Sequence, residues 1–172
     1  MIIERIGDIL ESEVNIICHQ TNCKGVMGGG IAKTIRDKIF TREQFDAYQT
    51  LCKDRDKELL GMIQPMFCKN KVIVNCFGEY DHKVYPATDY DALYRSLKTV
   101  KDNMILFTNS GILDRPRVLG IPGLIGCGLA GGSWDKVYKE ILVPLFAEGP
   151  QDLYIYYFTE EIYKKNHKGE KS

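Results

Sequence analysis

The chain has 172 residues, which suits one globular domain and would be cramped for two. Hydrophobic residues make up 44% and charged residues 27%, values that exclude a disordered or fibrous chain. Lys plus Arg and Asp plus Glu both total 23, so the formal net charge is zero. Because a chain without excess positive charge is not drawn to polyanions, we expect no stable nucleic-acid partner.

Neither the N-terminus nor the cysteines point to export or to metal binding. Charged residues interrupt the apolar N-terminal stretch, and no apolar run approaches the roughly 20 residues that cross a bilayer. The six cysteines are scattered and include no C-x-x-C pair of the kind that binds zinc. We therefore expect a monomeric cytoplasmic protein with reduced thiols, no membrane partner, no metal and no cofactor.

Short apolar strands alternate with helices along the chain. Residues 2–6 and 14–18 are rich in Ile and Val and predict strands, and residues 31–39 repeat Ile at helical spacing. Thr41, with Gln44 three positions later, forms a capping box that predicts the start of a second helix. The elements expected after it are strands at 63–68 and 71–77, a helix capped by Thr88 or Asp89, a strand at 118–121, a helix at 133–146 and a strand at 153–158.

This alternation predicts an α/β fold, a three-layer α/β/α domain with helices on both faces of a central mixed sheet. The domain is expected to span residues 1–159, followed by a charged C-terminal tail at residues 160–172, either a frayed helical turn or an extended segment. In open α/β sheets, ligands bind beyond the carboxyl ends of strands. Residues 25–30, the first glycine loop, and residues 123–132, the second glycine loop, both follow predicted strands, and we expect them to share one cleft.

The first glycine loop ends in three consecutive glycines, Gly28, Gly29 and Gly30, directly before a predicted helix. Unpaired backbone N–H groups and the positive end of the helix dipole attract an anion at such a position, and glycine lets a phosphate approach closely. A tight turn is the alternative, although a turn usually needs only one glycine. The loop therefore favours phosphate binding.

The second glycine loop matches the G-x-G-x-x-G pattern at Gly126, Gly128 and Gly131. In a dinucleotide-binding unit this pattern follows the first strand, and an acidic residue comes about 20 positions later. Here the pattern comes late in the chain, and Glu148 and Asp152 flank a helix-to-strand turn. An NAD-dependent oxidoreductase is therefore disfavoured, and two anion-binding loops fit the diphosphate of a nucleotide better.

Four blocks of sequence, in matching order, make the chain resemble a macrodomain, the fold that binds ADP-ribose. They are GDI at residues 7–9, NCKGVMGGGIA at 22–32, TDYDAL at 88–93 and IGCGLAGG at 125–132, and the resemblance covers residues 1–158. The chain is similar to the branch that contains ADP-ribose 1''-phosphate phosphatases, terminal ADP-ribose-glutamate hydrolases and antitoxins that strip ADP-ribose from DNA. The resemblance implies ADP-ribose or an ADP-ribosylated substrate as the partner.

The resemblance also implies a role for each matching position. Asp8 would accept a hydrogen bond from the adenine amino group beside Ile9, Phe158 would stack on adenine, and Asn22 would orient the distal ribose. Residues of the two glycine loops would hold the two phosphates. With them, the rest of the expected ligand-binding set is Thr21, Cys23, Gly28, Gly29, Gly30, Ile31, Ala32, Gly126, Cys127, Gly128, Leu129, Ala130 and Gly131. The alternatives are structural, namely a cap for Asp8, an Asx turn for Asn22 and a core position for Phe158.

His19 and Asn22 are the expected catalytic residues. His19 falls where the phosphatases of this branch carry a histidine, and an imidazole that titrates near neutral pH can act as a general acid or base. A buried, hydrogen-bonded histidine is the alternative, and Asp81 and His82 are the next candidates. Ala130 stands where the glutamate hydrolases have an aspartate, and residues 75–78 contain no counterpart of their lysine nucleophile.

Two functional hypotheses follow from these residues. The first is a hydrolase that removes a phosphate or a macromolecular ADP-ribosyl linkage from the 1'' position of the terminal ribose. The second is a non-catalytic reader or sequesterer of ADP-ribose-type nucleotides. Both place the same ligand in the same cleft, and they differ in whether water attacks at the 1'' position.

Overall fold

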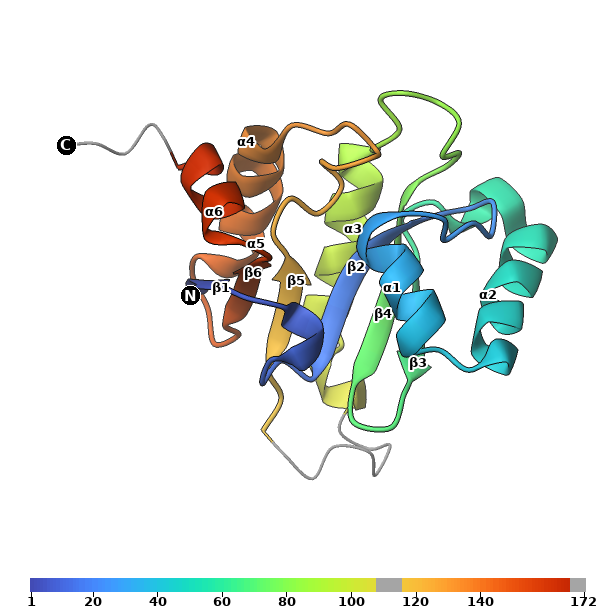
Figure 1. Cartoon of the computed structure of the whole chain (residues 1–172), viewed down its shortest axis with the longest axis horizontal. Coiled ribbons are helices and arrows are strands. Elements are labelled where there is room, and N and C mark those ends of the chain that lie inside the picture. The colour runs from blue at the N-terminus through green and yellow to red at the C-terminus, as the bar shows by residue number, and fades with distance from the viewer. Residues whose placement is uncertain (108–115, 168–172) are drawn as a thin grey trace.

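Within the described residues, 1–107 and 116–167 of the computed structural model, six strands form one sheet that helices surround (Figure 1). The strands are β1 (Ile2–Ile6), β2 (Ile16–Asn22), β3 (Ile63–Phe67), β4 (Val72–Glu79), β5 (Leu119–Pro122) and β6 (Leu153–Tyr157). The helices are α1 (Gly30–Lys38), α2 (Arg42–Arg55), α3 (Tyr90–Asp102), α4 (Trp134–Val137), α5 (Val143–Phe146) and α6 (Glu160–Asn166). Shorter or wider helical segments are η1 (Ile9–Glu11), η2 (Asp56–Leu59), η3 (Met104–Phe107) and the π-helical η4 (Tyr138–Leu142). None of the helices in these ranges combines the length and the apolar character needed to cross a membrane.

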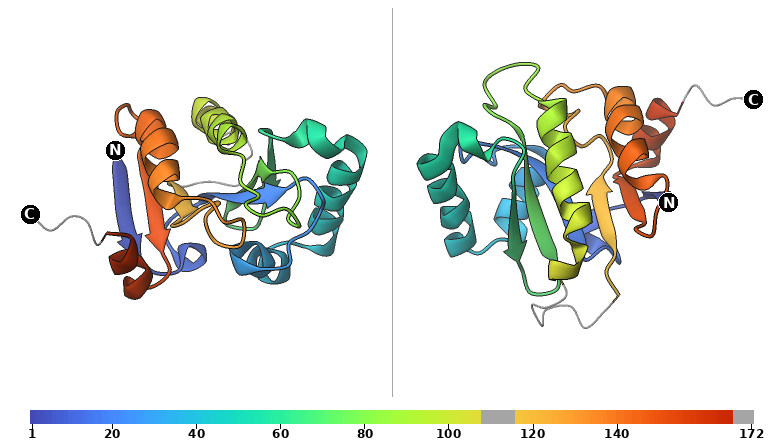
Figure 2. Two further views of the ribbon diagram at one scale, coloured as in Figure 1. Left: turned by 90° about the horizontal axis from the view of Figure 1, so that it is seen from above. Right: turned by 180° about the vertical axis from the view of Figure 1, so that it is seen from behind.

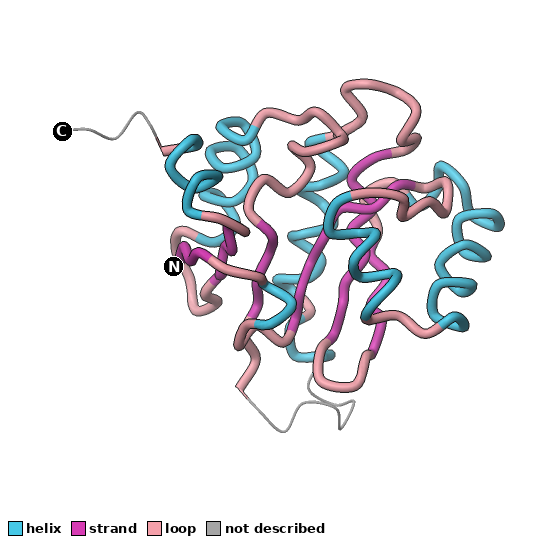
Figure 3. The backbone as a smooth tube through the Cα atoms, in the orientation of Figure 1, coloured by secondary structure: helices cyan, strands magenta, loops and turns pink. Residues whose placement is uncertain are grey.

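The sheet is mixed, with the strand order β1-β6-β5-β2-β4-β3. β3 and β4 correspond to the strands predicted at residues 63–68 and 71–77 and form an antiparallel pair, and every other pair of neighbours is parallel. The carboxyl ends of β1, β6, β5, β2 and β4 therefore lie at the same edge of the sheet. The loops that follow these strands gather along this edge, which is uppermost in Figure 3. We call it the carboxyl edge.

The sheet separates two hydrophobic clusters. Leu93 of α3 and Ile141 of η4 pack against alternate strand side chains on one face. Ile35 of α1 and Tyr48 of α2 pack with the strand side chains that point the other way. Figure 2 shows α3 and the continuous α4–α5 helix on one side of the sheet and α1 on the other. This arrangement confirms the predicted three-layer α/β/α fold with a central mixed sheet.

Side chains cap most of the helices, and α1 differs from them. The predicted capping box of α2 is present, with Gln44 N donating to Thr41 Oγ1 at 3.2 Å and Thr41 N donating to Gln44 Oε1 at 3.0 Å. The other side-chain caps are Asp89 for α3, Ser133 for α4 and Thr159 for α6. Gly29 precedes α1 and has no side chain to offer. The first N–H groups of α1 are thus left available to another acceptor.

β2 continues beyond the predicted strand at residues 14–18, because it stays paired with β4 as far as the Asn22–Glu79 register position. The polar segment HQTN predicts a loop, but Asn75 of β4 gives His19 a polar partner inside the sheet. At about 3.3 Å per residue, His19 lies about 10 Å below the end of β2 at Asn22. The longer strand therefore moves His19 away from the carboxyl edge.

The segment expected to begin a charged tail is a helix where the structure describes it. α6 packs Ile162 and Tyr163 against the core, and the Tyr163 ring stacks on His167 with centroids 4.0 Å apart. His167 Nε2 lies 3.1 Å from both carboxylate oxygens of Glu4 in β1. Residues 168–172 of the expected tail lie outside the described residues. Residues 160–167 therefore extend the domain at the β1 and β6 end of the sheet.

Replacement of Thr41 by alanine should destabilise the fold, because it removes the side-chain half of the α2 capping box. We expect T41A to lower the free energy of unfolding by about 1 kcal/mol in urea denaturation. Thr50 is exposed within the same helix and has no side-chain partner among the described residues, so T50A is the matched control and should leave that free energy nearly unchanged. Equal stability of T41A and T50A would show that the box contributes nothing.

Candidate functional site

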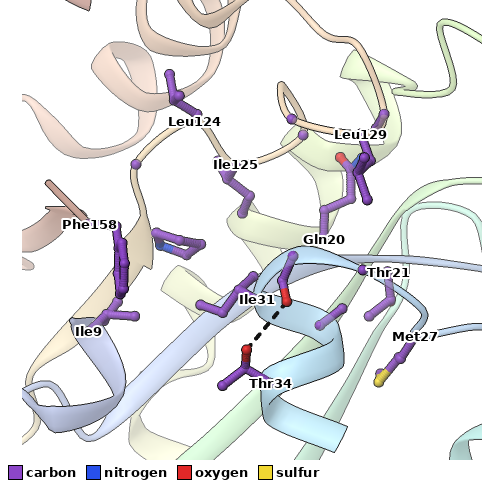
Figure 4. A pocket seen from close by; sticks show the side chains of 18 of the residues that line it. Ile9, Gln20, Thr21, Met27, Ile31, Thr34, Leu124, Ile125, Leu129 and Phe158 are labelled. Carbon is purple, nitrogen blue, oxygen red and sulfur yellow. Dashed lines mark hydrogen bonds between the residues drawn. The ribbon is translucent and has the colours of Figure 1, made fainter. Parts of the chain in front are cut away.

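A cavity of about 1020 Å³ opens at the carboxyl edge of the sheet. Residues from the loops after β1, β2, β4, β5 and β6 line it, and Figure 4 shows these side chains converging from elements far apart in the sequence. Both glycine loops contribute to its wall, so they share one cleft as the sequence predicts. Ligand pockets usually measure roughly 300–1,000 Å³, and this cavity is therefore large enough for a dinucleotide-sized molecule.

The first glycine loop and the first turn of α1 present backbone donors to the cavity. Residues 28–32 all line it, and their N–H groups have no acceptor among the described residues. Gly30 has φ +54°, a left-handed conformation that glycine adopts without strain. Thr34 Oγ1 donates to Gly30 O at 3.5 Å and ties the glycine to the next turn of the helix (Figure 4). The loop therefore forms a concave cluster of N–H groups at the positive end of the α1 dipole.

The second glycine loop forms a comparable cluster on the opposite wall. Gly126, Gly128, Leu129 and Ala130 line the cavity, and among the described residues nothing accepts from their backbone N–H groups. The loop folds back on itself where Gly132 N donates to Gly126 O at 2.9 Å. Its turns need left-handed φ values of +72° at Gly126 and +71° at Gly131, which explains the glycines there. The G-x-G-x-x-G pattern therefore shapes this loop without a dinucleotide-binding unit.

The two glycine loops approach each other across the cavity. Leu129 is 80% exposed at the tip of the second loop, yet its Cδ1 occupies the place that a Cβ at Gly29 would need. Glycine at position 29 thus lets the opposite loop come close. Because the two N–H clusters belong to loops in contact, one anionic group or two linked ones can reach both.

The second glycine loop is fixed from below by a side-chain relay. Gln20 Nε2 donates to Thr88 Oγ1 at 2.9 Å, and Thr88 Oγ1 donates to Gly126 O at 2.5 Å. Gln20 also lines the cavity, and its Oε1 is buried without a partner among the described residues. Ala87 N donates to Ala130 O at 2.8 Å and ties the other end of the loop. Gln20 is not among the site residues predicted from the sequence, because the polar segment HQTN is typical of a loop.

Asn22 fixes the first glycine loop in a similar way. Its Oδ1 accepts from Lys24 N at 3.0 Å, from Val26 N at 3.2 Å and from the buried hydroxyl of Tyr48 at 3.2 Å. Its Nδ2 donates to Val26 O at 2.7 Å. This is the Asx turn that was the structural alternative for Asn22, although Asn22 also lines the cavity with Thr21. Its amide therefore holds the loop in shape.

Asp8, Ile9 and Phe158 lie together at the end of the cavity formed by β1 and β6. Asp8 Oδ1 accepts from Leu10 N at 2.9 Å and caps η1, which leaves its second oxygen available. Phe158 is 67% exposed and stands beside Ile9 in Figure 4, so it is not a core residue. An exposed aromatic ring beside an apolar residue and a carboxylate can stack on a planar ligand and accept from its edge.

His19 does not line the cavity and is fully buried within the sheet. Its Nε2 lies 2.7 Å from Asn75 Oδ1, an acceptor, so Nε2 carries the proton and Nδ1 is left without a partner. Burial lowers the pKa of His19 from 6.5 to about 4, against the smaller opposing effect of the hydrogen bond to Asn75. This placement matches the structural alternative and does not support direct contact between His19 and a ligand.

The structure divides the remaining predicted residues. Ile31, Ala32, Leu129 and Ala130 reach the cavity wall, whereas Cys23, Cys127 and Gly131 do not. Burial raises the pKa of both the Cys23 and the Cys127 thiols to about 12, so neither is a thiolate at neutral pH.

Few ionisable side chains line the cavity. Of its described wall residues, Asp8, Lys38, Glu79, His82 and Tyr156 carry such groups, so no cluster of cations is available to hold an anion. His82 was the sequence's secondary candidate, whereas Glu79, at the end of β4, was missed. Burial raises the pKa of Glu79, and the nearby Asp81 charge adds to this effect. Within the described ranges, no three His, Cys, Asp or Glu side chains come together as a metal site.

These features define an α/β domain with a cleft at the carboxyl edge of its sheet, lined by backbone N–H groups that have no acceptor among the described residues. No protein-family model and no curated protein matches the sequence. Among solved structures, the chain is similar to the macrodomain of Mycobacterium tuberculosis DarG, with 27% identity and a TM-score of 0.71 over 91% of this chain and 97% of that one. The chain has the fold of a macrodomain.

Two more distant structures share this fold. Thermosipho africanus DarTG, solved in complex with ADP-ribose, is 18% identical with a TM-score of 0.69, and the match covers 90% of this chain and 41% of that one. A mutant of an Oceanobacillus iheyensis macrodomain, solved with ADPR, is 17% identical with a TM-score of 0.65, covering 97% of this chain and 90% of that one. At these identities the likeness concerns the fold.

The buried imidazole of His19 should remain neutral well below the pH at which an exposed histidine titrates. We expect its ring-proton NMR signals, assigned by their loss in H19Q, to titrate with a midpoint of about 4. Because the unfolded chain takes up this proton more readily, the free energy of unfolding should fall as the pH drops from about 6.5 towards 4. A midpoint near 6.5 would show that the ring reaches water and reopen a direct role.

Proposed function

We propose that this macrodomain binds ADP-ribose with its diphosphate between the two glycine loops. The observation that carries the proposal is the pair of unpaired N–H clusters, residues 28–32 and the free donors of the second glycine loop, on facing walls of one cavity. A diphosphate offers acceptors to both clusters, and main-chain donors explain why the cavity needs no cationic cluster. The ADP-ribose complex of the similarly folded Thermosipho africanus DarTG supports the same ligand.

The rest of the ligand would follow from this central anchor. The adenine would lie at the end formed by β1 and β6, with Phe158 stacking on it, Ile9 beside it and Asp8 accepting from its amino group. The terminal ribose would lie at the opposite end, where Asn22, Glu79 and His82 line the wall. β1 and β4 are separated by three strands, about 19 Å at the usual strand spacing, which suits an extended nucleotide.

The proposed reaction is hydrolysis at the 1'' position of the terminal ribose, releasing a phosphate or the group to which ADP-ribose is attached. The presence of ionisable wall residues at that end, Glu79 and His82, supports it. The second candidate is a reader that binds ADP-ribose without turnover. Ala130 in place of the aspartate of the glutamate hydrolases and the buried position of His19 favour the reader. Incubation with ADP-ribose 1''-phosphate and with ADP-ribosylated protein or DNA separates the two, since only the hydrolase gives product.

A bulkier side chain at Gly128 should block the ligand without disturbing the fold, since no atom lies within 4 Å of a Cβ placed there. In calorimetric titration with ADP-ribose, we expect wild type to bind and G128V to lose at least tenfold in affinity, about 1.4 kcal/mol. G128A serves as the graded control and should lose less, with all three proteins melting alike. Equal affinity of G128V and wild type would contradict the placement of the diphosphate.

Removal of the Asp8 charge should weaken adenine recognition and spare the fold. Asparagine caps a helix as well as aspartate does, but its free amide end repels an amino group. We expect D8N to bind ADP-ribose about 10-fold to 100-fold more weakly, as for a lost hydrogen bond to a charged acceptor. Asp54 is exposed on α2, so D54N is the matched control and should bind like wild type. Unchanged affinity in D8N would place the adenine elsewhere.

A further inference from the structure

Glu79 ends β4 at the carboxyl edge, where it pairs with Asn22 across an irregularity in the register of β2 and β4. It lines the cavity at the end away from Asp8, together with Asn22 and His82. The backbone of Glu79 also bridges to Thr88, the residue that fixes the second glycine loop. Its position is therefore set by three neighbouring elements and not by a mobile surface loop.

The carboxylate of Glu79 is not neutralised by a cation among the described residues. The Asn22 amide beside it favours its charged form, and the hydrogen bonds of that amide hold the first glycine loop. None of the ion pairs formed among the described residues includes Glu79, and His82, on the same wall, lies 3.5 Å from the Asp81 carboxylate instead. A carboxylate that lies beside one fixed amide, and that no cation pairs with, keeps an oxygen free to take a proton.

Hydrolysis at the 1'' position needs a group that takes a proton from water close to the terminal ribose. His19 is buried about 10 Å below the strand end and does not reach the cavity. Cys23 does not line the cavity, and Lys38 belongs to helix α1 and not to the strand end that carries Glu79. Glu79 and His82 remain at the end of the cavity proposed for the terminal ribose, and Glu79 is the better fixed of the two.

We infer that Glu79 is the catalytic base of this macrodomain, acting on the water that attacks the 1''-linked group. This inference rests on the proposed function. The carboxylate takes a proton from the water. At the same time the water oxygen bonds to the electrophilic atom of the 1'' linkage. The bond from that atom to the leaving oxygen breaks, its electron pair goes to the leaving oxygen, and the protonated Glu79 returns the proton there. The products are two hydroxyl-bearing fragments and a regenerated carboxylate.

This role has a defined pH dependence. A base must be ionised, and burial followed by the Asp81 charge raises the pKa of Glu79, against the lowering effect of Asn22. kcat should therefore fall as the pH drops through this raised pKa, at a higher pH than for an exposed glutamate. Two further titratable side chains face Glu79, namely Cys23 in the segment after β2 and Tyr48 in α2. Burial raises the pKa of both, so both side chains stay neutral in the pH range in which Glu79 titrates. His82 is the remaining titratable neighbour on the wall, and H82N removes its contribution.

The test compares E79Q with wild type in the full chain. Glutamine keeps an oxygen for the Asn22 amide but cannot accept a proton, so E79Q should melt like wild type and bind ADP-ribose with unchanged affinity by calorimetry. On whichever of ADP-ribose 1''-phosphate or ADP-ribosylated protein wild type hydrolyses, kcat should fall by about 100-fold or more with KM unchanged. The acid limb of the pH profile should disappear in E79Q and persist in H82N. E148Q changes an exposed glutamate in the segment between α5 and β6 and should behave as wild type.

Other results overturn the inference in distinguishable ways. Unchanged kcat in E79Q, with turnover by wild type, rejects Glu79 as the base while leaving the proposed function intact. A higher KM and weaker ADP-ribose binding with unchanged kcat would mean that Glu79 only contacts ribose hydroxyls. Binding of ADP-ribose by wild type without turnover of either substrate rejects hydrolysis itself, and with it any base.

Discussion

Backbone N–H groups without an acceptor cost free energy when water is excluded from them, so a fold rarely concentrates them without a ligand to satisfy them. This chain concentrates them twice beside one cavity, in residues 28–32 and in the second glycine loop. Under the proposed function, this arrangement favours an acceptor-rich anion and leaves side chains free for the two ends of the ligand. Phe158 and Asp8 occupy one end, and Glu79 and His82 the other.

The sheet makes this arrangement possible because five strand ends reach the same edge. Polar side chains near those ends then fix the loops. Asn22 ties the first glycine loop to Tyr48 of α2, and Gln20 ties the second to β2 through Thr88. Two residues near the end of β2 thus hold opposite walls of the cavity. Pre-set donors lose little freedom when a ligand binds, which favours affinity.

The sequence predicted the features that depend on local pattern. The glycine loops, the Thr41 capping box and the alternation of strands and helices all have short-range signals, and the shared cleft followed from the carboxyl-edge rule. The prediction of the end of β2 was wrong, because the polar run after Cys18 is typical of a loop. No local signal indicates that Asn75 of the neighbouring strand forms a hydrogen bond with His19. Glu79 was missed for the related reason that its place on the wall depends on the register between β4 and β2.

The central claim is that main-chain donors of both glycine loops bind one diphosphate. Titration of ¹⁵N-labelled protein with ADP-ribose, followed by amide NMR, tests it most directly. The account predicts that the amide protons of residues 28–32 and of Gly126, Gly128, Leu129 and Ala130 move downfield together along one binding curve, as new hydrogen bonds to phosphate form. Shifts confined to one of the loops, or absent from both while ADP-ribose binds elsewhere, would contradict the account.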